Sequence, residues 1–422
     1  MNTTSLPAQK ALLITLRTPD LSEEQCENYL DELHSLCLTL GIEPIEGDVV
    51  PVKRLHSRFL VGSGKAQELS DWANEIGADC IIFDDTISPS QQRNLEQLSG
   101  LCVIDRQEVI LEIFSEHART KEALLQVGLA RMEYSLPRLT RAWTHLSRQR
   151  GGTRGTRGEG ETQLEIDRRV VLKKITKLKR ELEKLQSQRS TRRKQRTSIP
   201  VPTGALVGYT NAGKSSLLNA LTGASAVVED QLFATLDPTT KKTELPGGTK
   251  VLLTDTVGFI RKLPHNLIDA FHSTLEETVV ADILIHVLDA SNPEVRHHIE
   301  TTQEVLNELA VGDTPTLLVF NKIDLCSDQY WLEELRRDFP DALFISIKQN
   351  IGVDEIFKKL EAMLFDSTPQ VQFRFPLSRY DLAAEIHRSG KVMREEYQDE
   401  FVLIEARVPV KLKYKLSEYL SA

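Results

Sequence analysis

A string of eight residues in the middle of the chain has the residue types and spacing of a phosphate-binding loop. Gly208 and Gly213 are five positions apart, and Lys214 and Ser215 follow directly. Such glycines let backbone N–H groups converge on a β-phosphate at a helix start, the lysine can bridge the β- and γ-phosphates, and the serine hydroxyl can bind magnesium. The predicted phosphate-binding residues are Gly208, Tyr209, Thr210, Asn211, Ala212, Gly213, Lys214 and Ser215.

A second motif ends the apolar run at 250–256. An acidic residue there, Asp255, can hold magnesium through a water, and the amide of Gly258 can bond the γ-phosphate and so sense whether it is present. The residues of this motif are Asp255, Thr256, Val257 and Gly258. A plain turn that closes a strand would be the interpretation if this motif stood alone.

A third motif predicts which base is bound. Asp324 lies just after the apolar run at 316–320, and its carboxylate can accept from both N1–H and the 2-amino group of guanine. Adenine has an acceptor at N1 and no 2-amino group, so ATP would leave that carboxylate unpaired. The motif comprises Asn321, Lys322, Ile323 and Asp324, which therefore indicate a GTP site.

Another strand end is expected to meet the guanine O6 through backbone amides. Its residues are Ser346, Ile347 and Lys348, and a plain strand end is the alternative because the tripeptide is not distinctive.

Phe259 follows Gly258 at a position where a hydrogen-bonding side chain could orient the attacking water. A phenyl ring cannot do so, and we predict slow intrinsic hydrolysis that a partner accelerates. The alternative is that Phe259 packs against the sheet while another group positions the water.

Taken together, these strings resemble the HflX family, ribosome-associated GTPases of the translation-factor-like P-loop class. The resemblance also rests on residues 233–240, FATLDPTT, and on residues 146–169, LSRQRGGTRGTRGEGETQLEIDRR, and it covers essentially the whole chain. It implies a cytoplasmic protein, expected to be a monomer, that binds the large ribosomal subunit and its rRNA and splits or rescues ribosomes, notably under stress.

The resemblance also assigns residues between the first two motifs. It implies that Thr235, in preference to Thr239 or Thr240, binds Mg²⁺ together with Ser215 when GTP is present. The nucleotide contacts that it implies there come from Phe233, Ala234, Thr235, Leu236 and Asp237. The residues expected to contribute to catalysis are Lys214, Thr235 and Gly258. Ile347 departs from the alanine usual in related GTPases, and we expect weaker packing there without loss of guanine recognition.

Alternating apolar and helical patterns predict an α/β fold with a P-loop GTPase domain built on a parallel sheet. We expect an N-terminal α/β domain at 1–120, a helical coiled-coil arm with a Gly/Arg-rich loop at 121–198, the GTPase domain at 199–367, and a small α+β domain at 368–422. Apolar residues at steps of three and four predict that the arm is an antiparallel helical hairpin.

The arm carries an unusual charge. Residues 138–196 contain 19 Lys or Arg and 6 Asp or Glu, a balance of +13 in a chain whose net charge is -9. This pattern favours a polyanion contact such as rRNA, with the Arg/Gly tip reaching into the RNA. A solvated helix face and a disordered linker are the alternatives.

The N-terminal domain contains a second Gly-Lys string, GSGK at 62–65. Phe59 occupies the position where the phosphate loop requires its first glycine, so a tight turn opening a helix is favoured. A nucleotide activity of this domain, on ATP, stays open as the alternative.

Composition narrows the remaining function classes. No apolar run approaches the roughly 18 residues that a membrane-spanning helix needs, and MNTTSLPAQKALLITLR lacks a secretory pattern. The five cysteines never form a CxxC pair, which disfavours a zinc site or a disulfide framework. The alternative from another class is an RNA assembly or sequestration factor in which GTP has negligible turnover. A membrane-linked GTPase is disfavoured because neither end carries a lipidation signal.

Overall fold

The computed structural model describes residues 9–139, 163–196, 201–223, 232–233, 236, 238–262, 278–309, 311–312, 314–366, 370–398, 400–408 and 410–421. The described residues up to Lys184 form one compact unit, and those from Leu185 onward form a second. Within the described residues, no helix combines the length and the apolar composition needed to cross a membrane.

The first unit is built on a parallel four-stranded sheet with the strand order β2-β1-β3-β4. Its strands are β1 Lys10–Arg17, β2 Glu43–Pro51, β3 Cys80–Phe83 and β4 Cys102–Asp105. The helices that follow them are α1 Glu23–Thr39, α2 Ser63–Glu75, α3 Pro89–Ser99 and α4 Arg106–His117. Serine side chains cap α1 and α3, and Asp105 caps α4, so polar residues fix where these helices begin.

The core of this sheet lies between its strands and the helices α2 and α3. Side chains such as Ile14, Ile81 and Val103 pack there against Leu69 and Leu95. Alternating crossover helices bury both faces of a parallel sheet, which explains why the strands are nearly continuous apolar runs.

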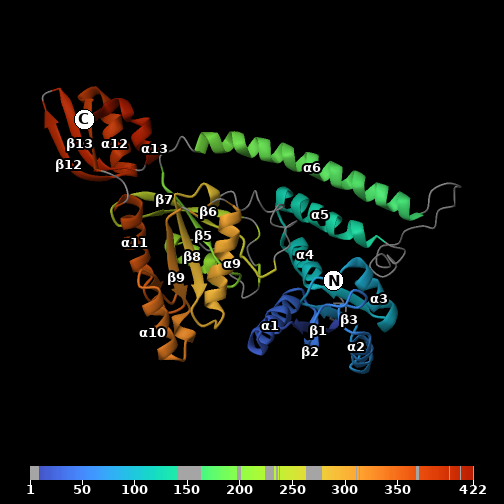
Figure 1. Ribbon diagram of the computed structural model, residues 1–422. Helices are drawn as coiled ribbons and strands as arrows, with labels where there is room; N and C mark the ends of the chain where they lie inside the picture. The colour runs from blue at the N-terminus through green and yellow to red at the C-terminus, as the bar shows by residue number, and fades with distance from the viewer. Residues whose placement is uncertain are drawn as a thin grey trace, which may run out of the picture. The chain divides into compact units, whose positions relative to one another are not determined.

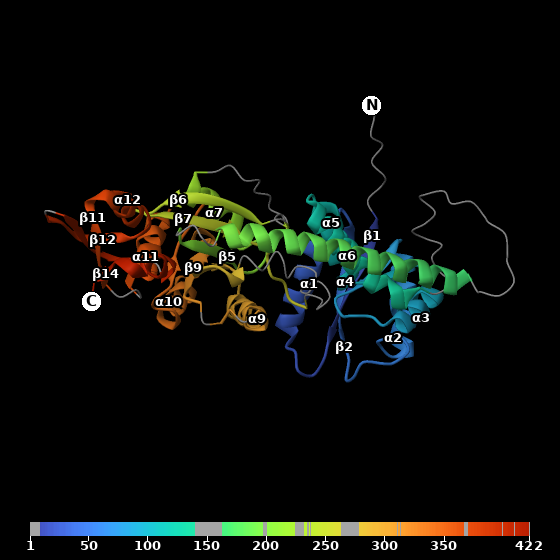
Figure 2. The ribbon, with the colours of Figure 1, turned by 90° about the horizontal axis from the view of Figure 1, so that it is seen from above.

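Two long helices form the predicted arm. They are α5 Lys121–Ser135, which continues into a 3-10 turn η1 Leu136–Arg138, and α6 Gln163–Arg196. Leu129 of α5 packs with Ile175 and Leu182 of α6, and the two helices lie side by side in Figures 1 and 2. This confirms that the apolar steps of three and four mark a helix-helix seam. The Gly/Arg-rich segment at 140–162 lies outside the described residues.

The second unit contains a six-stranded sheet with the order β10-β9-β8-β5-β7-β6. Its strands are β5 Thr203–Val207, β6 Thr239–Glu244, β7 Lys250–Asp255, β8 Ile283–Asp289, β9 Thr316–Asn321 and β10 Leu343–Phe344. Its helices are α7 Lys214–Thr222, α9 Val295–Glu308, α10 Gln329–Asp338 and α11 Val353–Asp366, with a 3-10 turn η3 Ile323–Leu325. All strand pairs are parallel except β6 with β7.

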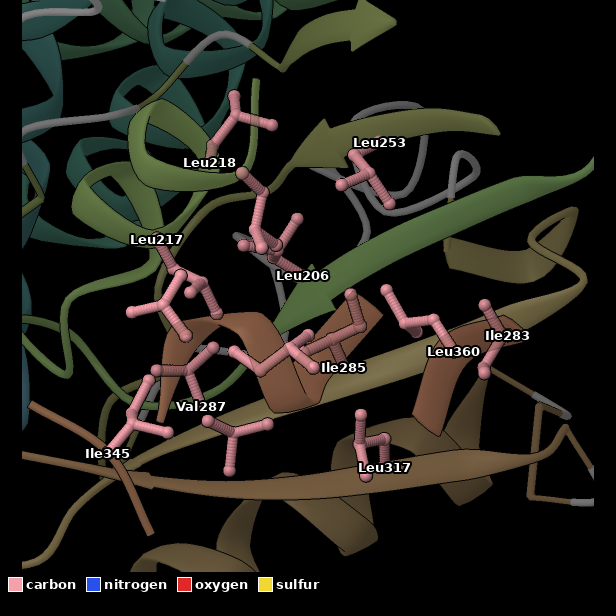
Figure 3. Packing of buried hydrophobic residues seen from close by; sticks show 14 of the residues in the cluster. Leu206, Leu217, Leu218, Leu253, Ile283, Ile285, Val287, Leu317, Ile345 and Leu360 are labelled. Atoms are coloured by element: carbon pink, nitrogen blue, oxygen red, sulfur yellow. The ribbon is translucent and has the colours of Figure 1, made fainter. Parts of the chain in front are cut away.

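Both faces of this sheet are covered. Figure 3 shows Leu206, Ile285 and Leu317 of the sheet packed against Leu217 of α7 and Leu360 of α11. The opposite face packs against α9 and α10 through two further apolar clusters. A parallel sheet buried on both faces gathers the polar carboxyl ends of its strands at one edge, where ligands bind in such folds.

A small antiparallel sheet, ordered β12-β13-β11-β14, lies at the end of the chain. Its strands are β11 Gln370–Pro376, β12 Lys391–Gln398, β13 Phe401–Arg407 and β14 Leu420–Ser421. It packs with the helices and turns η4 Leu377–Arg379, α12 Tyr380–Ser389, α13 Val410–Lys415 and η5 Ser417–Tyr419. The predicted fold class is therefore confirmed, while the domain boundaries remain a prediction.

The structure adds elements that the sequence patterns do not indicate. Thr239 and Thr240, the alternatives for the magnesium-binding threonine, lie in β6, where the Thr240 hydroxyl is 3.0 Å from that of Thr254. The large sheet is thus mixed, with an antiparallel edge strand. Strand β12 is also unexpected, because its alternating charged residues disguise its pairing with β13.

Candidate nucleotide-binding site

The predicted phosphate loop connects β5 to α7 with a backbone that only glycine accommodates at two points. Gly208 has φ 138° and Gly213 has φ 99°, both left-handed values that L side chains rarely adopt. A Cβ at Gly208 would lie 2.2 Å from the Val287 carbonyl oxygen, and one at Gly213 would lie 2.4 Å from Asn321 Nδ2. Any side chain at either position would therefore disrupt the loop.

Lys214 and Ser215 open helix α7 inside this loop. The Lys214 ammonium is buried and donates to the carbonyls of Gly208 at 3.1 Å and Tyr209 at 2.7 Å. Burial lowers the pKa of Lys214 to about 8, against the opposing effect of the Asp255 charge. The lysine is thus held within the loop at a helix N-terminus, where partial positive charge already favours an anion.

The second motif meets the first at the end of β7. The Ser215 hydroxyl donates to Asp255 Oδ2 at 2.6 Å, and Thr256 Oγ1 donates to the Leu206 carbonyl at 2.6 Å. A hydroxyl beside a buried carboxylate is a set of hard oxygen donors, which suits Mg²⁺. Among the described residues, no group of three or more His, Cys, Asp or Glu could hold a metal ion.

Gly258 lies directly against the phosphate loop. A Cβ on this residue would be 2.7 Å from Thr210 Cγ2 and 3.0 Å from Lys214 Nζ. The next residue, Phe259, is 2% exposed and belongs to an apolar cluster with Val207 and Leu284. The phenyl ring is therefore part of the core and does not face the phosphate loop.

The third motif is joined to the phosphate loop through Asn321. Its Nδ2 donates to the Ala212 carbonyl at 3.0 Å, and its Oδ1 accepts from the Ile347 amide at 3.2 Å. Lys322 has φ 63° and its ammonium pairs with Asp289 at 2.8 Å. Asn321 thus fixes the distance between the phosphate loop and the segment expected to contact the base.

The base-reading residues predicted from sequence also lie together. The buried Ser346 hydroxyl donates to Asp324 Oδ1 at 2.6 Å and accepts from the Gln349 amide at 3.1 Å. This arrangement orients the Asp324 carboxylate. Ile347 packs against the main core cluster of the sheet, so the larger side chain is accommodated. Lys348 follows in the same turn.

The expected magnesium-binding segment is only partly described. Phe233 and Leu236 are each 2% exposed. Ala234, Thr235 and Asp237 lie outside the described residues, so their predicted contacts stay predictions. Of the predicted residues that are described, the structure brings the phosphate-loop, second-motif and third-motif residues to the same edge of the sheet.

Sequence reasoning missed Asp289, the partner of Lys322. It ends the apolar run of β8 at the same register as Asn321 of β9. A polar residue at the carboxyl end of a parallel strand could have indicated it, because those ends gather at the ligand-binding edge.

Comparison with known proteins agrees with this geometry. Residues 27–115 match a family described as GTP-binding GTPase N-terminal, residues 117–196 match GTP-binding GTPase Middle Region, and residues 203–322 match 50S ribosome-binding GTPase. The chain is 46% identical to GTPase HflX of Akkermansia muciniphila over 430 residues, which covers 98% of this chain and 97% of that protein. The chain belongs to the HflX family.

A second HflX protein gives the same result. GTPase HflX of Escherichia coli is 40% identical over 383 residues, 90% of each chain. A solved GTP-binding protein from Sulfolobus solfataricus, in complex with GDP, is similar at 26% identity with a TM-score of 0.43, covering 84% of this chain and 98% of that one. As an HflX family member the chain is a P-loop GTPase that binds guanine nucleotides.

Proposed function

We propose that this GTPase binds the large ribosomal subunit in its GTP form, splits or rescues ribosomes under stress, and is released when GTP is hydrolysed. The observation that carries the proposal is the match of residues 203–322 to a family described as 50S ribosome-binding GTPase, in a chain whose arm is strongly basic. A cytoplasmic location follows from this role.

The nucleotide would act through the two segments nearest its third phosphate. Lys214 would bridge the β- and γ-phosphates, and the amide of Gly258 would donate to the γ-phosphate. The close approach of Gly258 to Thr210 and Lys214 supports this role, because it places Gly258 beside the lysine that would bridge the phosphates. Hydrolysis removes the γ-phosphate contact and releases the segment.

Magnesium is the cofactor that these residues fit. Ser215 would bind it directly together with Thr235, and Asp255 would hold it through a water. When bound, the ion neutralises charge on the β- and γ-phosphate oxygens. Asp324 would select guanine, with Ser346 holding its carboxylate in place.

The arm would supply the RNA contact. Among the residues of α6 whose side chains the structure describes, the exposed basic ones are Arg168, Arg169, Lys173, Lys174, Lys177, Lys179, Arg180 and Lys184. The opposite side of the helix is covered by α5. Basic side chains along one helix can replace the counterions of RNA phosphates, which gives affinity without reading sequence. The Gly/Arg-rich tip would reach further into the rRNA and disturb contacts between subunits.

The arm proposal can be separated from nucleotide binding. Replacing Arg148, Arg150, Arg154 and Arg157 by alanine should reduce ribosome splitting while GTP affinity stays within about twofold, because these residues belong to none of the nucleotide-binding motifs. Splitting is measured by sedimentation of intact ribosomes with a non-hydrolysable GTP analogue and then with GDP. Unchanged splitting by the fourfold variant would reject the role of the tip.

An assembly or sequestration factor with negligible turnover is the second candidate. The residue type at 259 favours it, because a phenyl ring that packs in the core cannot orient the attacking water. We propose instead that the ribosome supplies the missing order or catalytic group. Steady-state hydrolysis should be slow alone and should rise at least about tenfold with ribosomes. A rate that ribosomes leave unchanged would favour the second candidate.

A further inference from the structure

The side chain of Tyr209 contacts two segments outside the phosphate loop. Its side chain is 7% exposed, and its hydroxyl oxygen accepts a hydrogen bond from the Arg261 amide at 2.8 Å. Its ring stacks on the ring of His298 of α9, with 3.7 Å between centroids and 9° between planes. One side chain thus joins the phosphate loop to the segment after Gly258 and to α9.

The backbone joins the same segments at shorter range. The Thr210 amide donates to the Phe259 carbonyl at 2.8 Å, and the Phe259 amide donates to the Gly208 carbonyl at 3.0 Å. These two bonds form an isolated parallel bridge between Tyr209 and Phe259. Gly258 is therefore followed directly by Phe259, whose backbone is bonded to the phosphate loop.

The hydroxyl of Tyr209 extends this attachment by two residues. Without it, the segment would lose this attachment, and the buried amide of Arg261 would lose the hydroxyl as its acceptor. An amide that loses its partner away from water costs more than the net value of the bond. The hydroxyl is therefore a specific restraint on the end of the segment.

The bond between Tyr209 and Arg261 lies in a buried region. Both residues are 7% exposed. Water competes little for a buried hydrogen bond, so this hydroxyl–amide bond is stronger than one at the surface.

We infer that Tyr209 is a positioning residue for GTP binding and hydrolysis, which holds the segment 258–261 so that the Gly258 amide faces the γ-phosphate. The inference rests on the proposed role of Gly258. A preordered amide binds the γ-phosphate without first having to fix a mobile segment. GDP has no γ-phosphate and gains nothing from that order.

The test compares two variants that each lose only a hydroxyl. Tyr209→Phe keeps the ring stack on His298 and removes the bond to Arg261. Tyr330→Phe is the matched control, because Tyr330 of α10 is 84% exposed. Affinities for GMPPNP and GDP are measured by titration with the full chain, together with kcat and KM for GTP and the urea midpoint of unfolding.

We expect Tyr209→Phe to lower the ratio of GMPPNP to GDP affinity about threefold to tenfold, in line with one hydrogen bond. The value of kcat should fall by a similar factor, while GDP affinity stays within about twofold and Tyr330→Phe matches the native chain. Equal losses for both nucleotides, or no loss, would overturn the inference and leave Tyr209 with a packing role. Should the native chain bind large ribosomal subunits equally well with GMPPNP and with GDP, the proposed function fails instead.

Discussion

Two Gly-Lys strings in this chain look alike in sequence and differ in structure. Both follow a strand and open a helix, one at Gly213 before α7 and the other at Gly62 before α2. Gly213 has a left-handed φ and fits tightly under Asn321, whereas Gly62 has φ -62° and nothing lies within 4 Å of the position that a Cβ would take.

The lysines differ in the same way. Lys214 is buried and bonded to loop carbonyls, while Lys65 pairs with Glu68 at 2.9 Å on the surface. A phosphate site needs a backbone that surrounds the anion with its N–H groups and a cation held beside them. The string at 62–65 has the geometry of an ordinary helix start, which favours the tight-turn interpretation over an ATP site.

The largest expected effect concerns base selection. Asp324→Asn should weaken GTP binding about a thousandfold, because the amide cannot accept from both N1–H and the 2-amino group. Xanthosine triphosphate should recover much of that loss, since its 2-carbonyl can accept from the new amide. Asp341→Asn is the control, as its side chain is 99% exposed. Titration with both nucleotides measures the switch, and undiminished GTP affinity would contradict the assignment of Asp324.

The next effect separates the two lysines. Lys214→Ala should weaken GDP and GTP binding about a hundredfold, because it removes a charge-assisted bond to phosphate. Lys65→Ala should change neither affinity beyond about twofold, since its ammonium pairs with a surface carboxylate. Calorimetric titration of both variants with GTP and with ATP checks the comparison. Loss of an ATP-binding signal in Lys65→Ala would show that the string at 62–65 binds phosphate after all.

Substitution of one glycine in each Gly-Lys string should give a smaller effect, and the two changes in fold stability should have opposite signs. Gly213→Ala is expected to lower GTP affinity about tenfold and to destabilise the fold, because of its φ and the 2.4 Å approach to Asn321 Nδ2. Gly64→Ala lies inside α2 with open space around it, and it should stabilise the N-terminal unit by about 0.5–1 kcal/mol. Urea unfolding and GTP titration measure both; equal destabilisation by the two variants would remove the contrast.

The smallest expected effect on nucleotide binding comes from an ionic cluster in the N-terminal unit. Tyr134 donates to Asp105 at 2.9 Å, its hydroxyl oxygen lies 3.3 Å from Glu108 Oε2, and the Arg138 guanidinium lies 3.5 Å from the centre of the Tyr134 ring. Burial, followed by the Asp105 charge, raises the pKa of Glu108 from 4.5 to about 7. Between pH 4.5 and about 7, the folded unit therefore holds a proton on Glu108 that the unfolded chain has already released.

Stability of this unit should consequently fall as pH rises through that interval and level off above about pH 7. The loss is on the order of 2 kcal/mol, allowing for the partial exposure of Glu108. Glu108→Gln should flatten the dependence and leave GTP affinity unchanged. Hydrogen exchange of β3 amides in the full chain, at about pH 5 and about pH 8, measures it. A slope that survives in the variant would assign the proton to another group.

Much of the fold was predictable because its strands are continuous apolar runs and its helices carry polar caps. The length and β-branched residues of runs such as Ile283–Asp289 favour buried strands, and the seam of Leu129, Ile175 and Leu182 follows from helical spacing. Strands β6 and β12 were not predictable in this way. Thr239–Glu244 and Lys391–Gln398 are polar edge strands, whose pairing depends on a neighbour distant in sequence.

The candidate site shows the same division. The residue types at 208–215 and 321–324 predict chemistry from local spacing alone. The contacts that link them are tertiary: Asn321 to Ala212, Lys322 to Asp289, and Tyr209 to Arg261. No local pattern indicates such pairs, because each joins segments between which the chain makes a full crossover.

Nucleotide control of ribosome binding can be measured as the affinity of the chain for purified large ribosomal subunits with each nucleotide bound. We expect binding at least about tenfold tighter with GMPPNP than with GDP, and binding with an ATP analogue no tighter than with no nucleotide. Equal affinity for the subunit with GMPPNP and GDP would contradict the proposed function, since the third phosphate would then not control binding to the subunit.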